Sequence, residues 1–177
     1  YINMNNDIID LNNNEEIMES RVITGISYSK NDVRLTLMKM PDHSGLSAII
    51  FGSLAKEGIN VDMIVQNVSA DGNFIDITFT TTKEELERAK IAIKSIEKEI
   101  KYEEFLIDEN IAKISVIGVG MISNTGVAHT MFKTLASKGI NLLLISTSEI
   151  KISVLISKEY GELAVRALHR DFGLDSN

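Results

Sequence analysis

Residues 45–64 read GLSAIIFGSLAKEGINVDMI, and residues 126–145 repeat this stretch as GVAHTMFKTLASKGINLLLI, shifted by 81 positions. Eight of the twenty positions are identical, including the first glycine and the Gly-Ile-Asn near the end of each copy. Each copy predicts a helix followed by a glycine turn into a strand. Two copies are too few for a solenoid, so the repeat predicts a pair of related modules.

Alternating apolar residues and turn signals predict the elements around the first copy. We expect strands at 33–40, 60–69, 74–81 and 101–106, a helix from Gly45 to about Glu57, and an amphipathic, solvated helix at 83–99. Ser44 is the expected N-cap of the first helix, and Asp71-Gly72 the expected hairpin turn. The apolar stripe of that helix is predicted to comprise Ala48, Ile49, Phe51, Leu54 and Ala55. The order is that of a ferredoxin-like βαββαβ module.

The second copy predicts strands at 114–121, 141–147 and 151–156 and helices ending at Ser137 and Asp171, with no fourth strand. A strand predicted at 21–29 has no partner nearby and can supply the missing one, which removes an unpaired sheet edge. The second module then comprises 21–29 plus 113–174, and the first module, 33–108, is inserted into it. The alternative is that residues 21–29 pair with another chain.

Composition narrows the class of protein. The chain has 177 residues, 44% of them hydrophobic, with a net charge of −7 and no cysteine. A negative charge argues against nucleic acid and anionic membrane surfaces as partners, and disulfides and thiol chemistry are excluded. No apolar run has the length of a membrane span and no signal peptide is visible, so we expect a cytoplasmic protein. Residues 1–20, rich in Asn, Asp and Glu, predict a disordered or linker-like lead.

The loop that enters the first helix has the chemistry of an amino-acid site. The N–H groups and dipole of a helix N-terminus favour a carboxylate. Asp42 or Asp62 could accept the ammonium group, and Gln66 and Asn67 can both donate and accept hydrogen bonds. The simpler interpretation of the PDHSG loop, residues 41–45, is a turn followed by a helix cap.

Several segments carry a family resemblance: VITGISYSKNDVRLTL (22–37), PDHSG (41–45), INVDMIVQNVS (59–69), IAKISVIGVGM (111–121), GINLLLISTSEIKISVLI (139–156) and AVRALHRDFGL (164–174). Together they resemble the tandem ACT-domain regulatory region of bacterial aspartate kinases (aspartokinases). The resemblance implies an α+β fold of two interleaved ferredoxin-like ACT domains. The kinase domain of that family has no counterpart in these residues. We therefore expect a regulatory fragment, or a separate regulatory subunit translated from an internal start such as Met4 or Met18.

The resemblance also implies where an effector binds. Lysine or threonine is expected between two modules, at residues matching the family's site: Met40, Asp42, His43, Gly45, Leu46, Ser47, Val61, Asp62, Gln66 and Asn67. The second copy has Ser123, Leu143 and Thr147 in place of Asp42, Asp62 and Gln66, so it is a poorer binder of ammonium. It is either purely structural or a second effector or interface site formed by Asn124, Thr125, Gly126, Val127, Ser146, Thr147, Ser148 and Glu149.

The expected function is feedback inhibition. The chain would bind lysine and/or threonine, form a homodimer through its ACT domains and inhibit an attached or partner kinase domain, with no catalytic residue, metal or cofactor of its own. ATP and magnesium would belong to the kinase domain. The alternative is an ACT-type dimerisation or assembly subunit without its own ligand. The residues leave the choice between lysine and threonine open.

Overall fold

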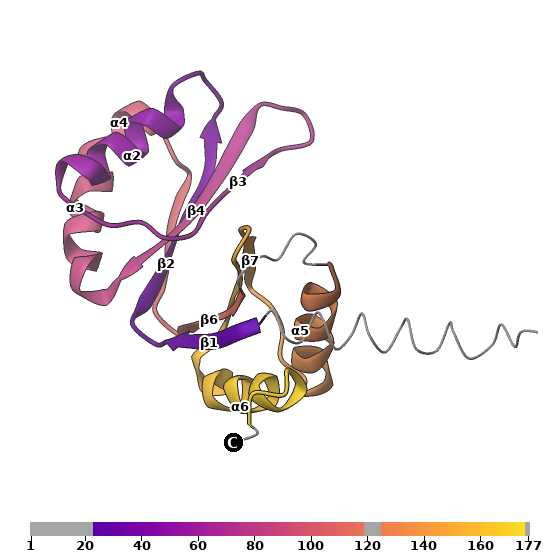
Figure 1. Ribbon diagram of the computed structural model, residues 1–177. Coiled ribbons are helices and arrows are strands. Elements are labelled where there is room, and N and C mark those ends of the chain that lie inside the picture. The colour runs from indigo at the N-terminus through magenta and orange to yellow at the C-terminus, as the bar shows by residue number, and fades with distance from the viewer. Residues whose placement is uncertain (1–22, 119–124, 176–177) are drawn as a thin grey trace, which may run out of the picture. The chain divides into compact units, whose positions relative to one another are not determined.

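A computed structural model describes residues 23–118 and 125–175 (Figure 1). The chain forms two compact units. The first module is residues 31–111, and the second consists of the chain up to Lys30 together with the chain from Ala112 onward. Each module contains one four-stranded sheet and its own helices, which confirms the predicted α+β, ferredoxin-like fold class. None of the described helices is long and apolar enough to cross a membrane.

The first module has the sheet order β3-β4-β2-β5, with its helices packed on one face (Figure 1). Val33, Leu35 and Leu37 alternate inward from β2 and are fully buried, as the period of two predicts. They share one core with α2 and α3. The elements are β2 (Asp32–Pro41), α2 (Leu46–Lys56), β3 (Ile64–Val68), β4 (Phe74–Thr82), the 3-10 turn η1 (Lys83–Glu85), α3 (Leu86–Ser95), α4 (Glu97–Ile100) and β5 (Glu104–Asp108).

The start of α2 differs from the prediction. The N-cap is Gly45 and not Ser44, with φ 89° in the left-handed region that favours glycine, and no side chain caps the helix. The buried residues of α2 are Leu46, Ile50 and Leu54, spaced by four. The predicted stripe was therefore wrong at its ends, because Ala48 and Ala55 are exposed and Ile50 was omitted.

Several other elements have different bounds; the strand predicted at 101–106 lies at Glu104–Asp108, and the strand predicted from residue 114 begins at Ile111. The strand predicted from Asn60 begins at Ile64, and the N–H groups of Asn60 and Met63 before it donate to the side chains of Glu85 and Thr80. The helix predicted at 83–99 consists of η1, α3 and α4, with a break at Ile96, where φ is −111°. The break turns Ile100 into the core, where it is fully buried.

The second module has the sheet order β1-β6-β8-β7. Strand β1 pairs antiparallel with β6, from Ile23 opposite Gly118 to Ser29 opposite Lys113, so the segment before the first module provides the fourth strand. The predictions for residues 1–22 and 119–124 lie outside the described residues. The elements are β1 (Ile23–Ser29), β6 (Ile111–Gly118), α5 (Thr125–Ser137), β7 (Leu144–Thr147), β8 (Lys151–Ser157), the 3-10 turn η2 (Lys158–Tyr160) and α6 (Gly161–Asp171).

A bulge in β1 changes which face of the sheet its first side chain occupies. Strict alternation places Ile23 on the face opposite Ile26 and Tyr28. The register shifts between Ile23 and Gly25, so all three side chains reach the same core, and Ile23 is 5% exposed.

Tyr28 of β1 also packs against Gly161, the first residue of α6. A Cβ atom at Gly161 would lie 2.5 and 2.6 Å from Cε2 and Cζ of Tyr28, and closer still to the hydroxyl. Gly161 has ordinary right-handed helical angles, φ −57° and ψ −51°, so its backbone does not require glycine. Glycine is therefore required at position 161 because the ring of Tyr28 occupies the space of a side chain. This contact packs β1 against α6.

We expect Gly161→Ala to destabilise the second module by about 1–3 kcal/mol through overpacking, although alanine alone favours a helix. The measurement is the urea midpoint of the single variant, of Tyr28→Ala and of the double variant. A favourable coupling between the two changes is expected, because Tyr28→Ala vacates the space. Additive effects would show that the contact is unimportant.

Candidate functional site

The loop from Asp42 to Gly45 leads into an open helix N-terminus. Asp42, His43 and Gly45 are exposed. Helix α2 has no side-chain cap and no acidic residue in its first turn, so no side chain competes for its first N–H groups. These groups and the positive end of the helix dipole form a ready site for a carboxylate.

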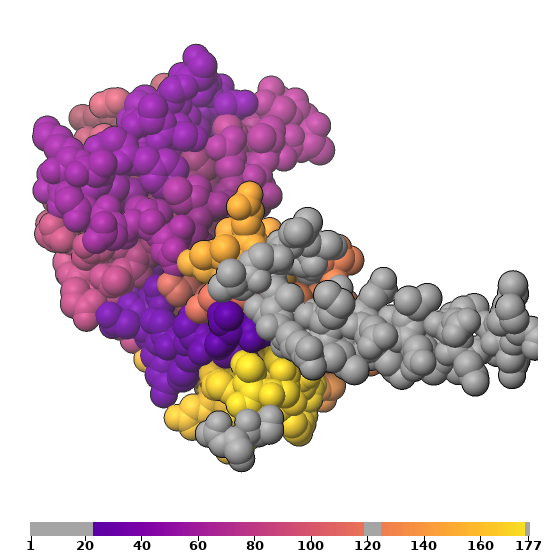
Figure 2. All heavy atoms as spheres, viewed as in Figure 1, coloured from indigo at the N-terminus to yellow at the C-terminus, as the bar shows by residue number. Residues whose placement is uncertain are grey.

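The β3–β4 turn supports this loop. The N–H of Asp42 donates to the carbonyl of Asn73 at 3.0 Å. Within the turn, the Ser69 hydroxyl and the Asn73 N–H donate to Asp71 at 2.6 and 3.0 Å, and these bonds lower the pKa of Asp71. Loop and turn project from the same end of the first module (Figure 2). The loop is therefore fixed by main-chain contacts, while its side chains remain at the surface.

A direct hydrogen bond joins the helix start to β3. The Ser47 hydroxyl donates to Oε1 of Gln66 at 3.2 Å. Gln66 is exposed and keeps its amide nitrogen as a donor. The structure thus brings together two of the predicted site residues, which are 19 positions apart in the sequence. The bond also orients the Gln66 amide beside the N-terminus of α2.

The remaining predicted residues divide into buried and exposed groups. Met40 and Leu46 are 0% and 2% exposed and belong to the core, so their side chains support the loop from beneath. Val61 packs partly against the same core. Asp62 and Asn67 are exposed, and the N–H of Asp62 donates to the carbonyl of Thr80 at 3.1 Å. His43 Nδ1 lies 3.1 Å from the Ser44 carbonyl oxygen, as in an ordinary turn.

The residues predicted for the second site lie partly in the core and partly at the surface. Val127 is 4% exposed and lies in the core of the second module. The Ser148 hydroxyl accepts hydrogen bonds from the N–H groups of Ile150 and Lys151 at 3.4 and 3.3 Å, as a residue of the β7–β8 turn. Thr125 and Gly126 begin α5, Ser146 and Thr147 end β7, and Glu149 is exposed in the turn. Asn124 lies outside the described residues.

Two surface hollows of the second module contain none of the predicted residues. One, of about 510 Å³, is lined by Lys138, Leu163, Arg166, Ala167, Arg170 and Asp175. The other, of about 350 Å³, is lined by His129, Thr130, Lys133, Thr134, Ser137 and Asp171. Hydrogen bonds from Thr134 and Arg170 lower the pKa of Asp171 beside them. Among residues 23–118 and 125–175, no cluster of three His, Asp or Glu side chains could hold a metal ion.

The ACT domain family matches residues 38–96 and 114–172, most of both modules. The chain belongs to the ACT-domain family. Aspartate kinase of Pseudomonas putida is 46% identical over 162 residues, covering 92% of this chain and 39% of that protein. The chain thus spans about two-fifths of the length of the curated aspartate kinases that it matches.

The two ACT domains are also similar to solved structures of aspartate kinases. The regulatory subunit of aspartate kinase from Thermus thermophilus, in its ligand-free form, is 38% identical, with a TM-score of 0.78 over 85% of this chain and 99% of that chain. A chain of the aspartokinase alpha and beta subunits is 39% identical, with a TM-score of 0.78 over the same shares. The chain therefore corresponds to the regulatory part of aspartate kinases, as the sequence resemblance implied.

Proposed function

We propose that the chain senses lysine and/or threonine and inhibits an aspartate kinase domain or subunit. The observation that carries this proposal is the uncapped N-terminus of α2, joined by the Ser47–Gln66 hydrogen bond to β3. The α-carboxylate of the effector would bind the N–H groups of Ser47 and Ala48 in the first turn of α2, since that of Leu46 donates to the His43 carbonyl at 3.3 Å. Its ammonium group would bind Asp42, whose exposed carboxylate makes no hydrogen bond or ion pair with another described residue.

In a single chain this site is open to solvent on one side. The strand beside it, β3, is at the edge of its sheet and has two exposed apolar side chains, Ile64 at 51% and Val68 at 55%. Such an edge favours pairing with another strand. We therefore propose that a second copy covers β3 and closes the site, so that effector binding stabilises one dimer arrangement.

Inhibition then requires the effector to bind two states of the dimer with different affinity. Allosteric coupling of this kind is typically worth about 1–3 kcal/mol. We propose that the chain before β1, near residues 10–20, transmits the preferred arrangement to the kinase domain. Whether that domain lies on the same or another chain, ATP and magnesium would bind there.

The exposed edge of β3 also suits the second candidate function, an assembly subunit without a ligand. A thermal-shift screen with the twenty amino acids separates the two candidates. A specific ligand at 100 times its dissociation constant adds about 2.7 kcal/mol of stability. Sensing predicts a shift with lysine, threonine or both; assembly alone predicts a concentration-dependent dimer and no shift.

Asp42→Ala and Gln66→Ala are expected to weaken effector binding about tenfold each, because each removes one polar contact worth roughly 1–2 kcal/mol. Calorimetry with lysine and threonine measures the effect, and circular dichroism should show an unchanged fold. Glu109→Ala, an exposed carboxylate outside the site, is the control. Unchanged affinity in both site variants would exclude this assignment.

A further inference from the structure

The chain between α2 and β3 carries Val61 and Asp62 but belongs to no regular element. Its far end is fixed by Thr80 of β4. The N–H of Met63 donates to the Thr80 hydroxyl at 3.0 Å, and the Thr80 N–H donates to the Met63 carbonyl at 3.1 Å. Thr80 is fully buried, so this end is anchored on the sheet.

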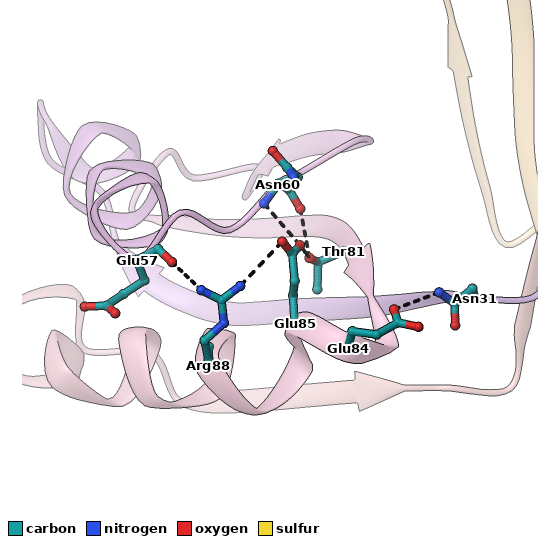
Figure 3. A network of polar contacts seen from close by, with 7 residues as sticks. All are labelled: Asn31, Glu57, Asn60, Thr81, Glu84, Glu85 and Arg88. Carbon is teal, nitrogen blue, oxygen red and sulfur yellow. Dashed lines mark hydrogen bonds and ion pairs between the residues drawn. The ribbon is translucent and has the colours of Figure 1, made fainter.

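The near end, Asn60, is bound by side chains from β4 and η1 (Figure 3). The Asn60 N–H donates to Oε2 of Glu85 at 3.1 Å. The Thr81 hydroxyl lies 2.8 Å from the Asn60 carbonyl oxygen and 3.0 Å from the same Glu85 oxygen, and its single hydrogen can serve one of them at a time. Glu85 therefore fixes the main chain two residues before Asp62.

Arg88 extends this contact to the end of α2. Its guanidinium donates to the Glu57 carbonyl at 2.6 Å and lies 3.6 Å from Oε1 of Glu85 (Figure 3). The Glu85 side chain is only 14% exposed, so its charge is partly shielded from water and interacts more strongly with these donors. We call Asn60, Thr81, Glu85 and Arg88 the Asn60 network.

The second ACT domain keeps the main-chain contact without the side chains. The Leu143 N–H donates to the Leu155 carbonyl at 2.8 Å, as the Asp62 N–H does to Thr80. When Lys83 is aligned with Lys158, Thr81, Glu85 and Arg88 correspond to Ile156, Tyr160 and Leu163. No carboxylate or guanidinium stands at these positions. The Asn60 network therefore belongs to the copy that has Asp42, Asp62 and Gln66.

We propose that Glu85 is a positioning residue for the effector site of the first ACT domain. By binding Asn60 it fixes Val61 and Asp62 relative to the α2 N-terminus, so that the ligand does not have to order this segment when it binds. The inference rests on the proposed function, because its consequence is a higher effector affinity. Glu85 itself touches no ligand in this scheme.

The test combines amide hydrogen exchange with calorimetry on the full 177-residue chain. In Glu85→Ala we expect exchange at Asn60 to accelerate at least tenfold and affinity for lysine or threonine to fall about tenfold. Glu85→Gln keeps one acceptor oxygen and should restore much of the Asn60 protection. Glu84→Gln, which alters a neighbouring exposed carboxylate bonded to Asn31, should change neither measurement.

A second variant, Ile100→Val, tests whether Glu85 affects binding only through the overall stability of the module. It weakens the core of the same module without altering the Asn60 network. If it lowers effector affinity as much as Glu85→Ala does, the loss reflects general instability and the proposal is wrong. Unchanged Asn60 exchange, or faster exchange with full affinity in Glu85→Ala, also overturns it. A wild-type chain that binds neither amino acid refutes the proposed function instead, while the exchange rates still report whether Glu85 fixes the segment.

Discussion

A chain that begins at Asn31 is expected to keep a folded first ACT domain and to lose the folded second one. The deletion removes Ile23, Ile26 and Tyr28 from the core of the second module. It also exposes the edge of β6, including the ladder from Ile114 to Gly118. Since removing one large core side chain commonly costs about 2–5 kcal/mol, removing three costs about as much as the whole stability of a small domain.

Two-dimensional NMR and urea unfolding measure this effect. Signals of residues 31–111 should stay dispersed, while those of residues 112–175 should collapse. Moving residues 21–30 behind residue 177 through a flexible linker of about ten residues should restore the second domain, because the fourth strand then follows α6. A deletion of residues 1–20 is the control. Dispersed signals from both domains in the shortened chain would contradict the role of β1.

Phe79→Ala is expected to destabilise the first ACT domain by about 3–5 kcal/mol. Phe79 is fully buried in β4, between β3 and β2 in the sheet order. Its ring meets Phe51 of α2 edge to face, with centroids 5.9 Å apart and planes at 74°. The change opens a cavity between sheet and helix and also forfeits an aromatic pair worth about 0.5–1.5 kcal/mol.

Chemical denaturation followed by circular dichroism gives the size of this change. The matched control is Ile91→Ala, in which an apolar side chain that is 69% exposed is truncated with an expected effect within about 0.5 kcal/mol. Effector binding should fall in parallel, since β4 is the strand on which β3 and Gln66 are aligned. Equal unfolding midpoints for the two variants would show that Phe79 is not a central core residue.

Much of the fold follows from the sequence, because the type of each helix or strand is determined by the pattern of apolar residues within it, and the repeat shows that the two modules are related. The types of all predicted elements in the described residues are correct, and so is the inward face of β2. Features that the sequence does not reveal lie where distant contacts determine the backbone. Lys39 has φ 55°, beside the irregularity between Leu37 and Met40, and its N–H donates to Asp76 at 2.7 Å. No local pattern around Lys39 specifies that bond.

The location of the candidate site was indicated by the sequence, but the residues that hold its backbone in place were not. Helix-end chemistry and the resemblance indicated the loop and the strand that contains Gln66, but not the Ser47–Gln66 hydrogen bond. Glu85 was missed because it stands in a charged run that reads as a solvated helix face. A comparison of the two copies contained a signal for it, since Thr81, Glu85 and Arg88 are polar where the second copy has Ile156, Tyr160 and Leu163.

The insertion of one domain into the other also has a consequence for the order of folding. Thr24 of β1 bonds to Ile117 of β6 across 93 positions, and closing a flexible loop of that length costs about 4 kcal/mol of chain entropy plus a constant. Once residues 31–111 fold, Arg34 stands opposite Asp108, so the two ends of the insert are adjacent strands. The long loop then behaves as a short one. We therefore expect the inserted domain to fold first and to act as the nucleus that brings β1 and β6 together.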